Sequence, residues 1–383
     1  MKILFISHDD GKYGAALSLK KLFTILKENY GVEPIIVTRK YNELNMYCEQ
    51  IGVESYALHY VGCITKISKS KFERLYNSAV QTTKNNIFHI IAEKELKKYV
   101  DLETIDLIYT NVSTIDFGAW LAKKYKIHHI WHIREFMDED IKGRPASSKY
   151  YKLMNQSDAV IAISKKIAEK WKEKGIDPRI INVIYNGIED NPNYIKRTNF
   201  YNGGILHTVF MGSAAPHKGL EHLIDAIKIV YEHNKSIQLD VYGNYENDYG
   251  KSLQEKVKNM GLEHVIIFKG YCSNIFEVLH NYDVGFVCSK AEGFGRVTVE
   301  FMLNELAVIA SDTGANPELI DNGETGILYS FGNHEDLSEK IELLYNDNSL
   351  IKKFAINGRI KALNQFTASM NAANIYNILT KFG

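Results

Sequence analysis

Short apolar runs alternate with amphipathic helical stretches along this chain, and the alternation occurs twice. In the first half, the apolar runs are Lys2–Ser7, Pro34–Thr38, Asp106–Thr110, His128–His132 and Ala159–Ser164. Continuous apolar runs of this length predict strands buried on both faces, and strands separated by helices predict a parallel sheet. The first half is therefore expected to form an α/β domain.

The same alternation resumes in the second half. Its runs are Leu206–Met211, Ile237–Tyr242, Val265–Lys269, Val284–Cys288, Ala307–Ser311 and Gly326–Tyr329. Residues 191–204 lie between the two series, and their polar, turn-rich sequence is typical of a linker. We predict an N-terminal Rossmann-like domain at 1–190 and a second at 205–365. A C-terminal helix within 366–383 is expected to pack back on the first domain.

The most specific motif runs from Glu292 to Glu300, with the sequence Glu-Gly-Phe-Gly-Arg-Val-Thr-Val-Glu. It follows an expected strand and opens a helix, so the backbone N–H groups at Gly295–Val297 can bind a diphosphate. Glu300, further into the helix, can accept hydrogen bonds from ribose hydroxyls, and Glu292 can accept them from a sugar. The alternative is an ordinary helix start with acidic residues placed for the helix dipole.

Further elements accompany this motif: Gly212-Ser-Ala-Ala-Pro-His-Lys218, Ser311-Asp-Thr-Gly, Asn316-Pro-Glu-Leu-Ile and Gly323-Glu-Thr-Gly. In combination, residues 284–330 resemble the donor-binding signature of glycosyltransferase family 4, a group of retaining enzymes with the GT-B fold. The resemblance is strong in the second domain and weak in the first. It implies two facing Rossmann-like domains with a cleft between them, where a sugar moves from a nucleotide-diphosphate donor, with UDP as the nucleotide.

The resemblance implies three catalytic residues. Lys218 matches the family lysine that neutralises the diphosphate, and Glu292 matches the residue that binds the donor sugar. His132, at the carboxyl end of an expected strand, resembles the histidine that faces the transferred sugar. A histidine there can also be a satisfied core residue, and a lysine at a helix start can be merely solvated.

The donor-binding residues that the resemblance implies are Gly14, Ser213, Tyr271, Phe294, Gly295, Arg296, Val297 and Glu300. Glu300 should bind the ribose, and the amides of Arg296 and Val297 should hold the distal phosphate. Tyr271 lies where the family meets the nucleobase, although it can equally be a core tyrosine.

Two positions depart from the family pattern. Ser213 stands where the family usually has an arginine, so one of two phosphate cations is missing; Arg296 and Arg134 are the candidates to replace it. In Gly11-Lys-Tyr-Gly14, the first of the usual two glycines is replaced. Gly14 still allows the backbone to approach a phosphate or the acceptor closely.

No metal or other cofactor is expected. The acidic run Asp138-Glu139-Asp140 is interpreted as a mobile loop rather than a metal site, because no second motif supports it. In GT-B enzymes, positive side chains and a helix dipole replace the metal. The four cysteines show neither CxxC nor zinc-like spacing, and the apolar start is too short for a signal peptide. A cytoplasmic location is expected.

The charge of the first half is uneven, although the whole chain is neutral. The excess lies in residues 61–100, which contain Lys66, Lys69, Lys71, Arg74, Lys84, Lys94, Lys97 and Lys98. The stretch is either a solvated helical face or a patch for anionic lipid headgroups. The second reading suggests a lipid-linked glycan acceptor and peripheral attachment to the inner face of the cell membrane. Nucleic acid is not an expected partner, since no binding motif accompanies the charge.

The expected activity is that of a hexosyl- or N-acetylhexosaminyl-transferase. The alternative is a noncatalytic GT-B scaffold or acceptor-binding partner, but Lys218, Glu292 and Glu300 are all retained and only Ser213 departs. A phosphorylase would need a lysine for pyridoxal phosphate, and no such sequence context is present. An epimerase would need paired acid and base carboxylates, whereas Glu292 and Glu300 are better explained as hydroxyl acceptors.

Overall fold

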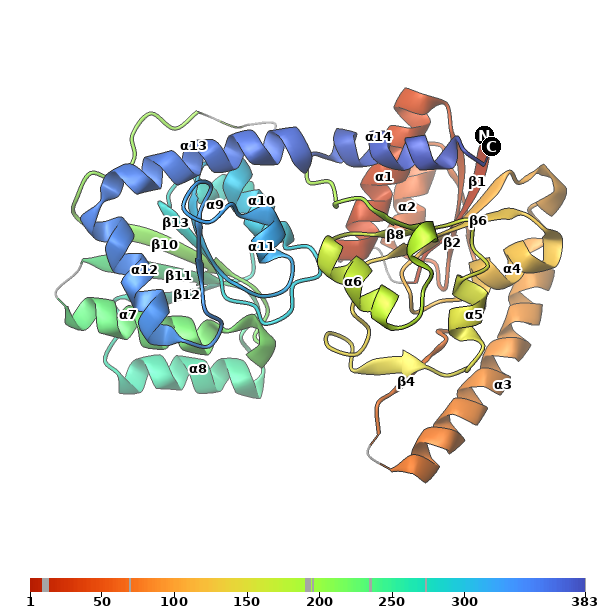
Figure 1. Cartoon of the computed structure of the whole chain (residues 1–383), viewed down its shortest axis with the longest axis horizontal. Coiled ribbons are helices and arrows are strands. Elements are labelled where there is room, and N and C mark those ends of the chain that lie inside the picture. The colour runs from red at the N-terminus through yellow and green to blue at the C-terminus, as the bar shows by residue number, and fades with distance from the viewer. Residues whose placement is uncertain are drawn as a thin grey trace. The chain divides into compact units, whose positions relative to one another are not determined.

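The computed structural model describes residues 1–8, 14–68, 70–189, 194, 196–233, 236–272 and 274–382. It divides into two compact units (Figure 1). Unit 1 contains Met1–Gly187 together with Ala368–Gly383, and unit 2 contains Ile188–Thr367. Each unit is a parallel sheet with helices on both faces, which confirms the expected pair of Rossmann-like domains. The predicted cleft between them stays a prediction.

Unit 1 is built on a seven-stranded sheet with the order β3-β2-β1-β5-β6-β8-β9. Its strands are β1 (Lys2–Ile6), β2 (Glu33–Thr38), β3 (Glu54–Ala57), β5 (Leu107–Asn111), β6 (His128–Ile133), β8 (Ala159–Ala162) and β9 (Ile181–Val183). All of the pairings in this sheet are parallel. A separate antiparallel pair joins β4 (Ile64–Lys66) to β7 (Gly143–Pro145).

Helices cover both faces of this sheet. They are α1 (Gly14–Tyr30), α2 (Glu43–Gln50), α3 (Lys71–Leu96), α4 (Phe117–Tyr125), α5 (Tyr150–Met154), α6 (Lys165–Glu173) and α14 (Ala368–Leu379). Local sequence sets their ends: Ser164 Oγ accepts a hydrogen bond from the Ile167 amide, as expected of an N-cap.

The last helix, α14, belongs to unit 1 although it follows unit 2 in sequence (Figure 1). It packs on α1. Ala372, Ile375 and Leu379 are fully buried in the same apolar cluster as Leu19 and Phe23 of α1. The helix therefore supplies part of the core of unit 1.

Unit 2 is built on a six-stranded parallel sheet with the order β12-β11-β10-β13-β14-β15. Its strands are β10 (Leu206–Met211), β11 (Ile237–Tyr242), β12 (Ile266–Gly270), β13 (Val284–Val287), β14 (Ala307–Ser311) and β15 (Ile327–Tyr329). Its helices are α7 (Leu220–Glu232), α8 (Asp248–Asn259), α9 (Phe276–Leu279), α10 (Arg296–Leu303), α11 (Asn316–Leu319), α12 (His334–Asn346) and α13 (Asn348–Gln365).

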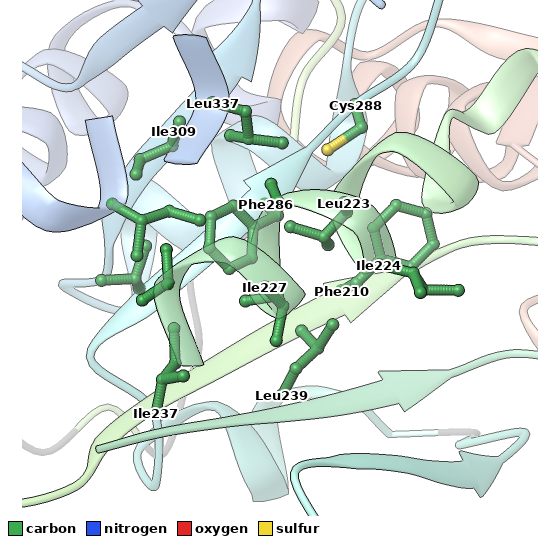
Figure 2. Packing of buried hydrophobic residues seen from close by; sticks show 14 of the residues in the cluster. Phe210, Leu223, Ile224, Ile227, Ile237, Leu239, Phe286, Cys288, Ile309 and Leu337 are labelled. Atoms are coloured by element: carbon green, nitrogen blue, oxygen red, sulfur yellow. The ribbon is translucent and has the colours of Figure 1, made fainter. Parts of the chain in front are cut away.

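The core of unit 2 forms where α7 packs on the centre of the sheet (Figure 2). Phe210 of β10 and Phe286 of β13 are register partners, and both are buried beside Leu223 of α7. Burying one such side chain contributes about 1.5–3 kcal/mol. This packing fixes α7 against the two central strands.

The segment predicted as a linker, residues 191–204, lies within unit 2 where the structure describes it. Arg197 explains this placement, because its guanidinium pairs with Asp283 and its amide donates to Glu305. The chain instead passes between the units at Gly187–Ile188 and at Thr367–Ala368. Residues 190–193 and 195 fall outside the described residues.

None of the helices within the described residues is long and apolar enough to cross a membrane. All four cysteines are present as free thiols.

Replacing Phe286 with alanine should lower the free energy of unfolding of unit 2 by about 3–5 kcal/mol, because the ring is fully buried between β13 and α7. Differential scanning calorimetry would measure the loss. Phe72→Ala is the matched control, since that ring is 79% exposed and its loss should cost less than about 0.5 kcal/mol. Equal losses in the two variants would contradict the assigned core.

Candidate functional site

Two loops of unit 2 leave the sheet at the same edge, because β10 and β13 are parallel neighbours. The loop after β10 contains Lys218, and the loop after β13 contains Glu292. They touch through their backbones: the Lys290 amide donates to the His217 carbonyl at 2.8 Å. Gly219 has a φ of +71°, and a Cβ there would lie 2.1 Å from the Cys288 carbonyl oxygen. Only glycine permits this approach.

Lys218 and Glu292 form an ion pair. Their Nζ and Oε1 atoms are 2.6 Å apart, and the side chains are 24% and 18% exposed. Ser289 Oγ lies 3.1 Å from the same Glu292 oxygen. Both charges are thus held in place yet open to solvent, so a bound anion could share the lysine and a bound hydroxyl could share the carboxylate.

The backbone of Glu292 is fixed by the turn that follows β14. Gly314 has a φ of +60°, and a Cβ there would lie 2.5 Å from the Glu292 nitrogen. The Ala315 amide donates to the Glu292 carbonyl at 2.9 Å. The turn therefore packs against the backbone of the Glu292 loop and holds it in position.

A buried polar network ties these loops to α10. Ser311 Oγ and Thr313 Oγ1 both donate to the Ser289 carbonyl, at 2.7 and 2.8 Å. The Asn316 amide group donates to the Ser311 carbonyl and its oxygen faces Thr298 Oγ1 at 3.1 Å. The roles of these side chains could not be predicted from the Ser311–Asn316 motif, because their partners lie on other segments of the chain.

The N-terminus of α10 opens beside this network. Gly295 is the N-cap residue with a φ of +89°, and within the described part of the chain no side chain caps this helix end. Arg296 and Val297 follow, half-buried. An Arg296 guanidinium nitrogen lies 3.3 Å from a Glu300 oxygen. The edge thus combines a helix N-terminus, two cations and two carboxylates, which suits a ligand with both anionic and hydroxyl groups.

The other predicted donor-binding residues of unit 2 differ in placement. Ser213 is exposed directly after β10. Tyr271 follows β12 and is 80% exposed, so it is not a core tyrosine. Phe294 is only 2% exposed, and its ring packs edge-on against Phe366 with centroids 5.9 Å apart. A ligand could therefore contact only the backbone of Phe294, because the side chain is buried beneath the loop.

His132 lies at the carboxyl end of β6 in unit 1 and is fully buried. Its Nδ1 is 2.5 Å from the Tyr109 hydroxyl and 3.2 Å from an Arg134 guanidinium nitrogen. Because arginine only donates, Nδ1 accepts and Nε2 carries the proton. Burial and the nearby Arg134 charge hold the pKa of His132 well below its usual range. The ring is therefore neutral and offers an N–H from Nε2, which has no partner among the described residues.

Arg134 is held by two asparagines. Its Nε donates to Asn111 at 2.7 Å, and its NH1 donates to Asn186 at 2.6 Å. These contacts orient both Arg134 and His132. Sequence reasoning missed Asn111 and Asn186, since nothing local marks an asparagine as a partner of a distant arginine.

The remaining sequence predictions for unit 1 concern Gly14 and the acidic run. Gly14 is the first residue of α1, and residues 11–13 of its motif lie outside the described residues. Asp138 pairs with Lys174 at 2.7 Å, Glu139 with Lys170 at 2.8 Å, and Asp140 accepts from the Phe136 and Met137 amides. These contacts hold the run in place, rather than leaving it as a mobile loop. The described residues contain no group of three metal-ligating side chains.

Comparison with known proteins decides the family. Residues 30–191 match the model named Glycosyltransferase Family 4, and residues 193–361 match Glycosyl transferases group 1. An uncharacterized glycosyltransferase of Methanocaldococcus jannaschii is 32% identical over 281 residues, which cover 70% of this chain and 74% of that protein. The chain belongs to glycosyltransferase family 4.

A further relative and a solved structure are also similar to this glycosyltransferase. The capsular polysaccharide biosynthesis glycosyltransferase CapM of Staphylococcus aureus is 27% identical over 199 residues, covering 51% of this chain and 50% of CapM. Among solved structures, Anabaena HepE in complex with UDP matches with a TM-score of 0.80 at 21% identity, over 100% of both chains. This match and similar ones confirm the GT-B fold of the glycosyltransferase.

Gly314→Ala should weaken nucleotide binding at this site, because the new methyl group must push the Glu292 loop away from its position. Gly323→Ala is the matched control: its φ is +79°, but a Cβ there meets nothing within 4 Å. Both variants bear the cost of a left-handed alanine, roughly 1 kcal/mol. Isothermal titration with UDP should show a loss of affinity for the first variant alone. Equal affinities would contradict the role of Gly314 in holding the Glu292 loop.

Proposed function

We propose that this glycosyltransferase is a retaining enzyme that moves a hexosyl or N-acetylhexosaminyl group from a UDP-sugar to a glycan acceptor in surface polysaccharide or glycoprotein assembly. The observation that carries the proposal is the Lys218–Glu292 ion pair beside the α10 N-terminus and Glu300. One relative is named for capsular polysaccharide biosynthesis, and HepE has been solved with UDP and with UDP-glucose. These names support the donor and the process.

In this proposal, unit 2 binds the donor. The ribose hydroxyls donate to Glu300, the diphosphate lies against the amides of α10 and Lys218, and the sugar hydroxyls donate to Glu292. Tyr271 is the candidate for the nucleobase, because its ring is exposed beside the end of β12. Arg296, in the first turn of α10, replaces the phosphate-binding arginine that the family usually has at the position of Ser213.

Glu300→Ala should abolish tight UDP binding, because the ribose then loses two charge-assisted hydrogen bonds worth about 1.5–3 kcal/mol each. Isothermal titration with UDP measures the loss. Glu339→Ala removes an exposed glutamate elsewhere in unit 2 and should leave the affinity unchanged. Undiminished affinity of the Glu300 variant would remove the ribose assignment.

The proposed reaction retains the donor's α linkage. The leaving diphosphate itself takes the acceptor proton on the same face, so the protein chiefly stabilises charge that grows on the phosphate. Lys218 and the α10 amides do this with a cation and preorganised dipoles. His132, neutral and donating through Nε2, can bind a sugar hydroxyl but is unsuited to act as a base, because its Nδ1 lone pair is already engaged.

Lys218→Ala should reduce turnover about 10²–10³-fold while changing donor affinity much less, because the charge it stabilises develops mainly in the transition state. Initial rates with UDP-α-glucose and UDP-α-N-acetylglucosamine would be compared with titrations of UDP. NMR of the product gives the anomeric configuration, and a β product would refute retention. A fully active Lys218 variant would refute the phosphate role.

The same assay tests two further parts of the proposal. The phosphate is neutralised by side chains and helix amides, so EDTA should leave the rate unchanged and no cofactor should be required. If Mg²⁺ or Mn²⁺ is needed to restore the rate, metal independence is wrong. The alternative is a noncatalytic scaffold, which is favoured by the presence of Ser213 in place of the usual arginine. Transfer of sugar by the wild type would exclude this alternative.

The acceptor is proposed to be lipid-linked, and the enzyme is accordingly proposed to bind peripherally to the inner face of the cell membrane. The first turns of α3 carry Phe72, Leu75 and Tyr76, which are 79%, 64% and 62% exposed. Lys71 and Arg74 lie among them. Large apolar side chains next to basic ones are typical of a helix that lies in the interface of an anionic membrane. Lys69 falls outside the described residues.

Replacing Lys66, Lys71 and Arg74 together with glutamine should weaken binding to vesicles of phosphatidylglycerol and phosphatidylcholine, because each such charge contributes about 1 kcal/mol near an anionic surface. Vesicle co-sedimentation measures this. Lys251→Gln/Lys258→Gln removes exposed charges of α8 and should bind as the wild type does. Equal sedimentation of the α3 variant would overturn the membrane proposal, and UDP binding should be unaffected in all variants.

A further inference from the structure

Unit 1 contains a pocket of about 430 Å³ that the proposed function does not use. Its walls come from α3, α4, α5 and the segment before α5, all within unit 1 (Figure 1). The lining residues used below are Asn85, His89, Asp116, Trp120, Lys123, Lys149 and Lys152. The volume falls within the usual range for small-molecule sites.

Three buried polar side chains form the floor. Asn85 of α3 donates to both oxygens of Asp116, at 2.8 and 3.0 Å. His89, one turn further along α3, has its Nε2 3.0 Å from an Asp116 oxygen. The three residues are 6%, 2% and 7% exposed, in the order Asn85, His89, Asp116. A carboxylate at this depth needs both donors.

Two polar atoms of this floor lack partners. Asn85 Oδ1 and His89 Nδ1 are buried, and neither makes a hydrogen bond within the described residues. An unpaired buried polar atom has lost its hydrogen bonds to water without replacement, so such atoms are uncommon in folded proteins. Both residues line the pocket, so a ligand could supply the missing partners.

The arrangement at Asp116 departs from ordinary helix capping. Asp116 is the N-cap residue of α4, yet its side chain makes no capping hydrogen bond within the described chain. Aspartate normally accepts from the first amides of its own helix. Here the carboxylate faces Asn85 and His89 instead, which holds both side chains at the pocket.

Both atoms are matched by a hydroxyl group. Asn85 Oδ1 is an acceptor. Because a carboxylate only accepts, His89 Nε2 carries a proton, and Nδ1 accepts in the neutral ring or donates in the charged one. Hydroxyl groups, which both donate and accept, are therefore the complementary ligand groups. Trp120 lies next to His89 with ring centroids 5.1 Å apart and is partly exposed, so it offers a flat apolar surface of the kind that packs against a sugar ring.

The rim of the pocket is basic. Lys123, Lys149 and Lys152 are exposed there, and none has an acidic partner within 4 Å among the described residues. Among the described residues that line the pocket, Asp116 is the single acidic one, and its carboxylate already accepts hydrogen bonds from Asn85 and His89. The net positive charge favours an anion such as a phosphate.

We propose that this pocket is a second carbohydrate site, which binds a phosphorylated sugar or polyol with its hydroxyls on Asn85 and His89, its ring on Trp120 and its phosphate among Lys123, Lys149 and Lys152. The ligand is either a soluble sugar phosphate or the headgroup of a lipid, which share this chemistry. The site goes beyond the proposed function, because it lies outside the donor-binding residues of unit 2.

The test uses the full chain with saturating UDP, so that the donor site is filled. Glucose 1-phosphate is titrated in one arm, with glucose and inorganic phosphate beside it. In the second arm, vesicles with phosphatidylinositol are compared with vesicles of equal phosphatidylglycerol content. Tryptophan fluorescence is the local readout, because the three tryptophans are Trp120, Trp131 and Trp171, and the latter two are fully buried in unit 1. The signal should vanish in Trp120→Phe.

Lys149→Gln/Lys152→Gln should weaken the binding of the active probe at least tenfold, since two charge-assisted contacts are lost. The matched control Lys251→Gln/Lys258→Gln removes two exposed charges that lie outside the pocket lining, and it should change the binding less than twofold. Preference for glucose 1-phosphate supports a soluble ligand, and selective binding of phosphatidylinositol supports a headgroup. Absence of saturable binding in both arms, or equal loss in both double variants, would overturn the site. UDP binding and sugar transfer, measured on the same samples, report separately on the proposed function.

Discussion

The parallel pairing of β10 with β13 determines the candidate donor site. After β10 the sheet of unit 2 grows outward through β11 and β12, and then it resumes on the other side of β10 with β13. At such a reversal, neighbouring strands send their following loops to opposite faces, and a ligand can enter between them. The contact of Gly219 with Cys288 and the Lys218–Glu292 ion pair both depend on that pairing.

The charges at this edge nearly compensate one another in the absence of a ligand. Lys218 pairs with Glu292, and Arg296 pairs with Glu300. Neither pair is fully buried, so neither contributes much stability on its own. A diphosphate with adjoining hydroxyl groups can contact the cations and the carboxylates at the same time. On binding, each cation would exchange its carboxylate for a phosphate oxygen, and each carboxylate would accept a hydrogen bond from a hydroxyl group. All four charged side chains would then keep a partner. The rigid part of the site is the backbone behind Glu292, fixed by Gly314 and the Ser311 network.

The sequence predicted the strands of both sheets well where they are apolar and central, but it missed β3 and β9. Those edge strands are short and half-exposed, so no apolar run marks them. The Glu292–Glu300 motif located the site because its residues are adjacent in sequence. The motif could not predict the orientation of the Phe294 side chain, whose ring packs inward against Phe366. The Asn85–Asp116 contact was not predictable, because residues of two separate helices meet only in the folded unit.

The return of α14 to unit 1 has a consequence for synthesis on the ribosome. Ile375 and Leu379 complete an apolar cluster that includes Phe23, which is made more than three hundred residues earlier. Unit 2 is continuous in sequence and can fold as soon as it emerges. Until α14 is made, the apolar side chains of α1 lack the partners that this helix supplies, and transiently exposed apolar surface of this kind promotes aggregation. The order of translation is thus the reverse of the order in which the two domains can be finished.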